Sequence, residues 1–259
     1  ENDKLNITEY TQICMLAAEL AIYEVLKAKG IACDMTAGLS LGEYGALVAA
    51  GVMTVEDALA VVRKRGIYMQ NAVPEGGAMS AVLGLDPETI KGICEKVSSD
   101  NNGRIVSVAN YNCPGQTVIT GEKEMVDLAG AECKEAGAKR VLPLKVSGPF
   151  HSKMLTGAGS QLRETLDQVE LGEIKVPYIT NVTADYVTDK DDIRDILERQ
   201  VSSSVCWQQT IERMLADGAD EFIEIGPGRS LAGFMKKINK DVTVVNIDKL
   251  EDFEKYVNR

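Results

Sequence analysis

The sequence predicts an α/β fold in which a large domain with a mostly parallel sheet carries an inserted small domain. Apolar runs typical of strands alternate with amphipathic runs typical of helices along most of the 259 residues. One stretch, 78–144, departs from this alternation and follows the order βαββαβ, which is the ferredoxin-like unit. We therefore expect a discontinuous large domain over 1–77 and 145–259, and an insert over 78–144 whose two ends lie close together.

The first part of the chain predicts a helix, a strand and two more helices. Apolar residues recur at helical spacing over 9–29, and Thr8 can cap that helix. A short apolar strand over 31–37 follows, and then a helix over 43–50. Thr54 begins a sequence that resembles a capping box, so we expect another helix to start there and to stop before the next proline.

The remaining elements follow from the same signals of apolar period and turn residues. In the insert, the residues 110–115 are rich in asparagine and glycine and predict a loop between the two central strands. After the insert, strands again alternate with helices, which indicates parallel pairing in the large domain. The insert is expected to hold strands at 78–83, 105–109, 116–120 and 140–144 and helices at 86–97 and 122–136; the rest is expected to hold helices at 153–169, 191–200, 207–216 and 231–238 and strands at 176–180, 221–225 and 242–247.

Composition and charge exclude several classes of protein. A net charge of −11 argues against nucleic-acid binding, which requires a basic surface. No apolar run reaches the roughly 20 residues of a membrane helix, and no signal peptide opens the sequence. Without any C-x-x-C pair, the six cysteines indicate reduced core or near-core thiols in a cytoplasmic protein and no metal site. They are Cys14, Cys33, Cys94, Cys113, Cys133 and Cys206.

The most informative motif is G-x-S-x-G at 38–42, which lies between the apolar strand and a helix. This context is that of a nucleophile elbow, a sharp turn that presents the hydroxyl of Ser40 at the edge of a sheet. We expect Gly38 and Gly42 to let the strand and the helix pass close together. The alternative interpretation is a glycine-bearing loop with an exposed serine.

His151 is the only histidine in the chain. A serine hydroxyl needs a base to become a nucleophile, and histidine is the commonest base near neutral pH. If Ser40 has a histidine base, that base is His151; a structural or solvent-exposed histidine is the alternative. No acidic residue stands out as a third member, so either a carboxylate or a backbone carbonyl could orient the ring.

Five motifs occur in an order and spacing that resemble the malonyl-CoA:acyl carrier protein transacylases, the acyltransferases of type II fatty acid synthesis. The resemblance covers essentially the whole chain, and five ordered motifs are far more specific than the elbow alone. The motifs are G-L-S-L-G-E-Y at 38–44, R-G with M-Q at 65–70, N-Y-N-C-P-G-Q at 110–116, V-S-G-P-F-H at 146–151 and E-I-G-P-G at 224–228.

The resemblance implies an α/β-hydrolase-like large domain and a ping-pong acyl transfer. Ser40, deprotonated by His151, takes the malonyl group from malonyl-CoA and passes it to the phosphopantetheine thiol of acyl carrier protein. The backbone N–H of Leu41 is implied as an oxyanion donor, and Arg65 as the partner of the malonyl carboxylate. No cofactor, no metal, no nucleic acid and no membrane are implied, and a cytoplasmic monomer is expected. Asn110, Asn112 and Gln116 are implied near the coenzyme and the acyl chain.

Three departures from the family pattern accompany the resemblance. Leu39 stands where a histidine usually precedes the serine, and Cys206 stands where a glutamine usually precedes Trp207. The resemblance implies that the backbone carbonyl at position 206 could orient His151, in which case the change of side chain there is tolerated. The family's first strand and its G-Q-G-x-Q loop, which supplies a second oxyanion donor, have no counterpart in this sequence, so we expect a truncated copy.

The sequence leaves other functions open. One is acyl transfer or acyl hydrolysis with another substrate, and the replacement Arg65→Ala would discriminate it by its effect on the preference for malonyl groups. The other is an inactive remnant that only docks a carrier protein. For an acidic carrier, the nearest basic patch in the sequence consists of Lys139, Arg140 and Lys145.

Overall fold

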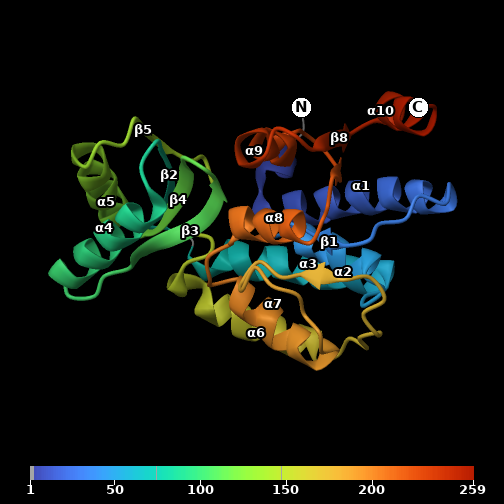
Figure 1. Ribbon diagram of the computed structural model, residues 1–259. Coiled ribbons are helices and arrows are strands. Elements are labelled where there is room, and N and C mark those ends of the chain that lie inside the picture. The colour runs from blue at the N-terminus through green and yellow to red at the C-terminus, as the bar shows by residue number, and fades with distance from the viewer. Residues whose placement is uncertain (1–2, 74, 147) are drawn as a thin grey trace.

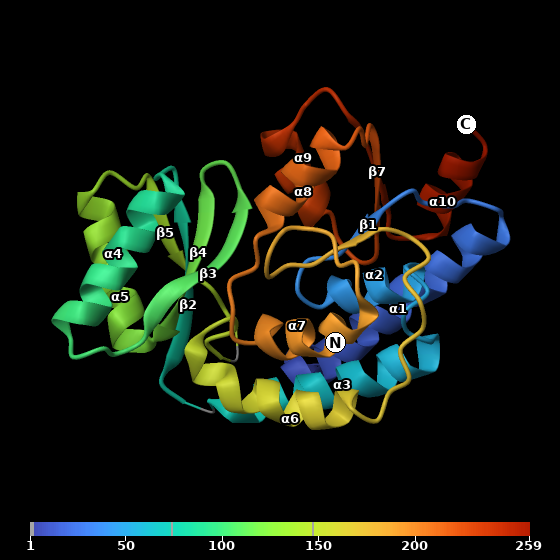
Figure 2. The ribbon, with the colours of Figure 1, turned by 60° about the horizontal axis from the view of Figure 1, so that its bottom comes forward.

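The computed structural model describes residues 3–73, 75–146 and 148–259. It has two parts, a smaller one built on a four-stranded sheet and a larger one in which helices surround short parallel strands (Figure 1). The turned view shows the smaller part standing beside the larger one (Figure 2). No helix in the described part of the chain is long and apolar enough to cross a bilayer.

The N-terminal helices pack against each other around the buried core of the larger part. After a short 3-10 turn, α1 spans Thr8–Ala28 and crosses α3, Val55–Ala72. A Cβ atom on Gly66 would lie 2.9 Å from Cα of Glu9, so the crossing depends on this glycine. Ile7 is the residue before α1, and Thr8 is its first residue, so the predicted cap is wrong by one position.

The predicted strand over 31–37 is present only as β1, Thr36–Ala37, and is followed by α2, Gly42–Ala49. Strand β1 pairs in parallel with β6, Tyr178–Ile179. Ile31 packs instead against a cluster that contains Leu26 and residues of the C-terminal strand β8, Thr243–Ile247. The apolar start of this segment therefore reflects burial beside a helix end rather than strand pairing.

The smaller part has the predicted ferredoxin-like topology. Its antiparallel strands stand in the order β3-β4-β2-β5. Helix α4 begins where the sequence predicts it, because the side chain of Asp86 accepts a hydrogen bond from the N–H of Thr89 at 2.9 Å. The elements are β2, Gly77–Leu83; α4, Pro87–Asp100; β3, Val106–Cys113; β4, Gln116–Glu122; α5, Lys123–Glu135; and β5, Arg140–Pro143.

The loop predicted over 110–115 is largely strand, which corrects that expectation. Strand β3 continues to Cys113, and the turn before β4 is the pair Pro114 and Gly115. The extension has two partners, because Asn110, Tyr111 and Cys113 pair with β4 and the N–H of Tyr111 donates to the carbonyl of Val205 at 2.9 Å. The composition of the segment fits a turn, but pairing on both sides holds it extended.

The rest of the larger part alternates helices and strands, as predicted, and ends with a further helix, α10, Leu250–Val257, beyond the last predicted strand. Its strands pair in parallel, as expected, but β7 and β8 form a pair separate from that of β1 and β6. The elements are η2, Lys153–Leu155; α6, Thr156–Leu166; η3, Lys190–Asp192; α7, Ile193–Gln200; α8, Trp207–Ala216; β7, Glu221–Ile225; α9, Ser230–Ile238; β8, Thr243–Ile247; and α10, Leu250–Val257.

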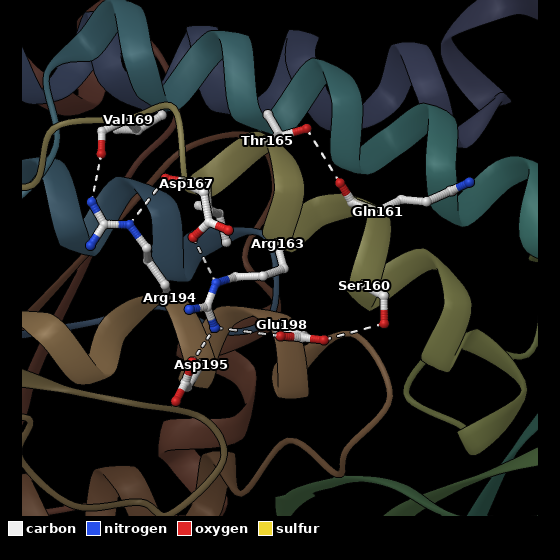
Figure 3. Close-up of polar contacts among 10 residues, drawn as sticks. Ser160, Gln161, Arg163, Thr165, Asp167, Val169, Arg194, Asp195 and Glu198 are labelled. Atoms are coloured by element: carbon white, nitrogen blue, oxygen red, sulfur yellow. Dashed lines mark hydrogen bonds and ion pairs between the residues drawn. The ribbon is translucent and has the colours of Figure 1, made fainter.

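Helices α6 and α7 are fixed to each other at their exposed faces (Figure 3). Arg163 on α6 forms ion pairs with Asp195 and, at 3.6 Å, with Glu198 on α7. A Cβ atom on Gly159 would lie 2.7 Å from the carbonyl oxygen of Glu198, so the two helices also approach closely. The contact matters because α7 ends at Gln200, which reaches the site described below.

The segments that lead into and out of the smaller part run side by side. A Cβ atom on Gly77 would lie 2.3 Å from Cδ of Pro149, which leaves no room for a larger residue there. Strand β3 is the edge that packs against α8 and α9. The division into domains over 1–77, 78–144 and 145–259 stays a prediction.

All six cysteines are free. Cys94, Cys113 and Cys133 are buried, as expected of core thiols, and Cys206 is half-buried. Cys14 and Cys33 are exposed, so the expectation of core or near-core positions is wrong for these two.

Candidate active site

The serine of the G-x-S-x-G motif occupies a strained turn between β1 and α2. Ser40 has φ 52°, the left-handed region that residues with a side chain rarely adopt. Asn181, just after β6, holds the turn on both sides: it accepts a hydrogen bond from the N–H of Ser40 at 2.5 Å and donates to the carbonyl of Gly38 at 2.6 Å. The geometry is that of a nucleophile elbow.

The two glycines of the motif differ in their structural roles. A Cβ atom on Gly38 would lie 2.0 Å from the carbonyl carbon and oxygen of Gly42, a distance that no packing can accept. A Cβ atom on Gly42 would meet nothing within 4 Å. The expectation that both glycines provide room is therefore correct for Gly38 and wrong for Gly42.

Gly38→Ala is expected to destabilise the protein by more than about 4 kcal/mol, because the turn must open to admit the methyl group. Gly42→Ala is the matched control and should change the free energy of unfolding by less than about 1 kcal/mol. Urea denaturation followed by circular dichroism measures both. Equal stability of the two variants would contradict this account of the turn.

His151 lies next to Ser40 although 111 positions separate them in the sequence. Nε2 of the ring is 2.8 Å from the Ser40 hydroxyl oxygen, and the side chain is buried at 4% exposure. Nδ1 faces the backbone carbonyl oxygens of Gln200 at 2.9 Å and Ser203 at 3.2 Å. Because both of these groups only accept, Nδ1 carries the proton of the neutral ring and Nε2 is free to accept one from Ser40.

Main-chain carbonyls, rather than a carboxylate, orient the ring of His151. The expectation that position 206 supplies this carbonyl is wrong. The carbonyl oxygen of Cys206 accepts instead from the N–H of Thr210 at 2.9 Å, one turn into α8. The orienting carbonyls come from the end of α7 and from the loop that follows it.

Burial, with a smaller contribution from the charge of Arg65, lowers the pKa of His151 from its ordinary 6.5 to about 4, although the two carbonyls oppose the shift. Because the unfolded chain binds a proton more readily than the folded one, His151 destabilises the fold as the pH falls below 6.5. The loss reaches about 3 kcal/mol by pH 4.

We expect His151→Asn to remove this contribution. The free energy of unfolding of the wild type should fall by about 3 kcal/mol more than that of the variant between pH 7 and pH 4. Urea denaturation of both proteins across this range measures the difference, in which the carboxylates common to both cancel. Parallel profiles would contradict the lowered pKa.

Arg65 is the largest fully buried side chain and lies at 1% exposure beside Ser40. Its guanidinium donates to Oε1 of Gln12 at 2.7 Å, to Oε1 of Gln200 at 3.0 Å and to the hydroxyl of Ser40 at 3.0 Å. Its Nε has no partner among the described residues. Burial lowers the pKa of Arg65, although Tyr44 and Glu43 oppose the shift. A buried cation whose partners are neutral therefore faces the candidate nucleophile.

Four residues behind the elbow were not identified as site residues from the sequence. Gln200 donates through Nε2 to the carbonyl of Ser40 at 2.9 Å and also to Glu43, which is fully buried. Burial raises the pKa of the Glu43 carboxyl, and its hydrogen-bond donors oppose the shift. The four residues are Gln12, Glu43, Asn181 and Gln200. Glu43 could have been noticed in the sequence as a charged residue in an apolar helix, whereas the three amide residues show no pattern that indicates a role.

The remaining predicted site residues lie at different places. Leu41 follows Ser40 with helical angles (φ −57°, ψ −43°) and directly precedes α2. Asn110 and Asn112 are buried in β3, and Gln116 is half-buried at the start of β4. No hydrogen bond between described residues joins these three to Ser40 or His151. The described residues also contain no cluster of three histidine, cysteine or carboxylate side chains able to hold a metal ion.

The chain is similar to known acyltransferases along almost its whole length. The acyl transferase domain family matches residues 1–248. A malonyl CoA-acyl carrier protein transacylase of Bacillus subtilis is 45% identical over 253 residues, which are 97% of this chain and 79% of that protein. A transacylase of the same name from Staphylococcus aureus is 44% identical, over 97% of this chain and 81% of that protein.

Solved structures agree with these relatives. The crystal structure of MCAT from Streptococcus pneumoniae has a TM-score of 0.94 and 46% identity, covering 99% of this chain and 83% of that one. A malonyl-transacylase in complex with its type II PKS acyl-carrier protein has a TM-score of 0.94 and 42% identity, covering 99% of this chain and 82% of that one. With its elbow serine beside a buried histidine, this chain is an α/β enzyme that belongs to the acyl transferase domain family.

Proposed function

We propose that the protein transfers a malonyl group from coenzyme A to the phosphopantetheine thiol of acyl carrier protein, through a malonyl ester on Ser40, in fatty acid biosynthesis. The observation that carries the proposal is the buried guanidinium of Arg65, 3.0 Å from the Ser40 hydroxyl and surrounded by neutral acceptors. Such a cation is suited to an anionic ligand, and its planar fork can bind a carboxylate through two hydrogen bonds. The names of the similar transacylases support malonyl as that ligand.

In the first half-reaction, Nε2 of His151 takes the proton from the Ser40 hydroxyl while its oxygen attacks the thioester carbon. The backbone N–H of Leu41, directly before α2, is proposed to donate to the oxyanion. The carbon–sulfur bond then breaks, and the proton on His151 passes to the sulfur of coenzyme A. The malonyl group is left as an ester on Ser40, with its free carboxylate on Arg65.

In the second half-reaction, the phosphopantetheine thiol accepts the malonyl group from Ser40. His151 takes the thiol proton, the sulfur attacks the ester carbon, and the bond to the Ser40 oxygen breaks. The same proton returns to Ser40, which restores the starting state. No cofactor is required beyond the coenzyme A thioester itself, and Asn110, Asn112 and Gln116 are proposed as contacts of the coenzyme and the acyl chain.

The acceptor is proposed to be acyl carrier protein because one of the similar structures is a malonyl-transacylase in complex with its carrier. The basic patch of Lys139, Arg140 and Lys145 is a proposed contact for an acidic carrier. Arg140 lies on β5, the edge of the small sheet opposite β3, which packs on the larger part. A monomeric enzyme in the cytoplasm remains our expectation.

The test is to incubate the protein with malonyl-CoA and to measure its intact mass and the modified peptide. We expect one malonyl group on Ser40, its removal by a phosphopantetheine thiol, and no modification of Ser40→Ala. Steady release of coenzyme A without a thiol acceptor would favour an acyl hydrolase. No modification at all would sink the transferase proposal and favour an inactive protein that only docks a carrier.

A further inference from the structure

A carboxylate with neutral partners lies directly behind the nucleophile. Glu43 is in the first turn of α2 and has 0% exposure. It accepts hydrogen bonds from the hydroxyl of Tyr178, from the N–H of Asn181 at 3.3 Å and from Nε2 of Gln200. Burying a carboxylate among neutral donors is unfavourable unless those bonds are well made. The cost indicates a role beyond filling space.

Gln200 connects this carboxylate to the other groups of the site. Its Nε2 donates to Glu43 and to the Ser40 carbonyl at 2.9 Å, while its Oε1 accepts from Arg65 at 3.0 Å. Its main-chain carbonyl accepts from Nδ1 of His151 at 2.9 Å. One residue at the end of α7 thus contacts the serine, the base and the arginine.

The side chain of Gln200 can satisfy these neighbours in one orientation only. An ionised carboxylate and a backbone carbonyl only accept hydrogen bonds, and a guanidinium only donates them. With Nε2 toward Glu43, the amide presents Oε1 to Arg65; rotation by 180° would place N–H donors against N–H donors and oxygens against oxygens. The charge on Glu43 therefore determines that Gln200 presents its oxygen, and not its N–H groups, to Arg65.

We propose that Glu43 is a positioning residue for the acyl carboxylate site: it fixes the amide of Gln200, which in turn holds the guanidinium of Arg65 beside Ser40. The inference rests on the proposed function of Arg65. In this arrangement Glu43 balances the buried cation across a neutral amide without pairing with it. The guanidinium donates to three neutral acceptors, and its Nε has no partner among the described residues, so it can still donate to an anionic ligand.

The test is Glu43→Gln, which removes the charge at nearly constant size and lets position 43 donate to Gln200. We expect the ratio of kcat/KM for malonyl-CoA to that for acetyl-CoA to fall about tenfold, mostly through KM for malonyl-CoA. Tyr178→Phe is the matched control, because it removes a donor to the same carboxylate without changing the acceptors of Gln200. Its ratio should match the wild type. Equal losses on both thioesters in Glu43→Gln, or an equal change of ratio in Tyr178→Phe, would overturn the proposal.

A second variant keeps the inference testable if Glu43→Gln does not fold. Gln200→Met removes the amide but keeps the main-chain carbonyl that His151 uses, and it should lower the same ratio by about tenfold. In the double variant the two effects should not multiply, because both act through one amide. Multiplied effects would contradict the connection from Glu43 to Arg65.

Arg65→Met, measured beside these variants, separates the two proposals. If Arg65→Met retains the preference for malonyl-CoA, the proposed function of Arg65 fails and this inference fails with it. If Arg65→Met loses the preference while Glu43→Gln and Gln200→Met retain it, only the positioning role of Glu43 is overturned.

Discussion

Arg65→Met is expected to lower kcat/KM for malonyl-CoA by about 10²- to 10³-fold, while slow transfer from acetyl-CoA stays within about threefold of the wild type. The guanidinium is at 1% exposure, so its contact with a carboxylate is made out of water, where a charged hydrogen bond is strong. The kcat/KM of Arg65→Lys for malonyl-CoA should lie between those of the wild type and Arg65→Met, because an ammonium keeps the charge but lacks the planar fork. Steady-state kinetics with both thioesters measures the three proteins.

Arg63 provides the matched control for this prediction. It lies on the same helix two positions earlier, and its side chain, at 36% exposure, pairs with Glu9 at 3.1 Å. Arg63→Met removes an arginine of α3 without touching Ser40, and the preference for malonyl-CoA should persist. Equal losses on both thioesters in Arg65→Met would show that Arg65 acts on the serine rather than on the acyl carboxylate.

Removing Arg65 should weaken the fold. The replacement Arg65→Met avoids the desolvation of a buried charge, but it leaves Oε1 of Gln12 and Oε1 of Gln200 without the donor that they have now and removes the cation that faces Glu43 across the amide. We therefore expect the melting temperature of Arg65→Met to lie below that of the wild type, and scanning calorimetry of both proteins measures the difference. A melting temperature equal to that of the wild type would contradict the connection between Arg65 and Glu43.

The sequence predicts an element well where its local signals and its packing agree. Helix α8 and strand β7 have the predicted bounds, Trp207–Ala216 and Glu221–Ile225. Local signals failed where a distant segment determines the conformation. The stretch 110–113 has the composition of a turn, yet it pairs with β4 on one side and meets Val205, more than ninety positions later, on the other.

The same distinction applies to the site. Ser40 and His151 could be identified because the motif is specific and the histidine is unique in the chain. Gln12, Asn181 and Gln200 could not, because an amide side chain carries no periodic signal and acquires its role when three distant segments meet. For Gly42 the sequence predicted too much. A glycine inside a specific motif suggests close packing, but a Cβ atom at this position would meet nothing within 4 Å.

His151→Ala is expected to lower the rate at which malonyl-CoA modifies Ser40 by about 10³-fold. Nε2 lies 2.8 Å from the hydroxyl oxygen, and the carbonyls of Gln200 and Ser203 hold the proton on the opposite nitrogen. The alanine variant keeps the serine, the Leu41 N–H and Arg65, so substrate still binds but no group takes the proton. Quenched-flow measurement of the acyl-enzyme gives the rate directly.

The pH dependence of the same reaction distinguishes a base from a structural histidine. Because burial lowers the pKa of His151 to about 4, the ring is neutral from pH 5 to pH 8, and the wild-type rate should be flat over that range. In His151→Ala the residual rate should rise with pH, because hydroxide must then take the proton, and added imidazole should restore part of it. A variant that is as fast as the wild type, or slow at every pH and unaffected by imidazole, would leave the histidine with a role in structure alone.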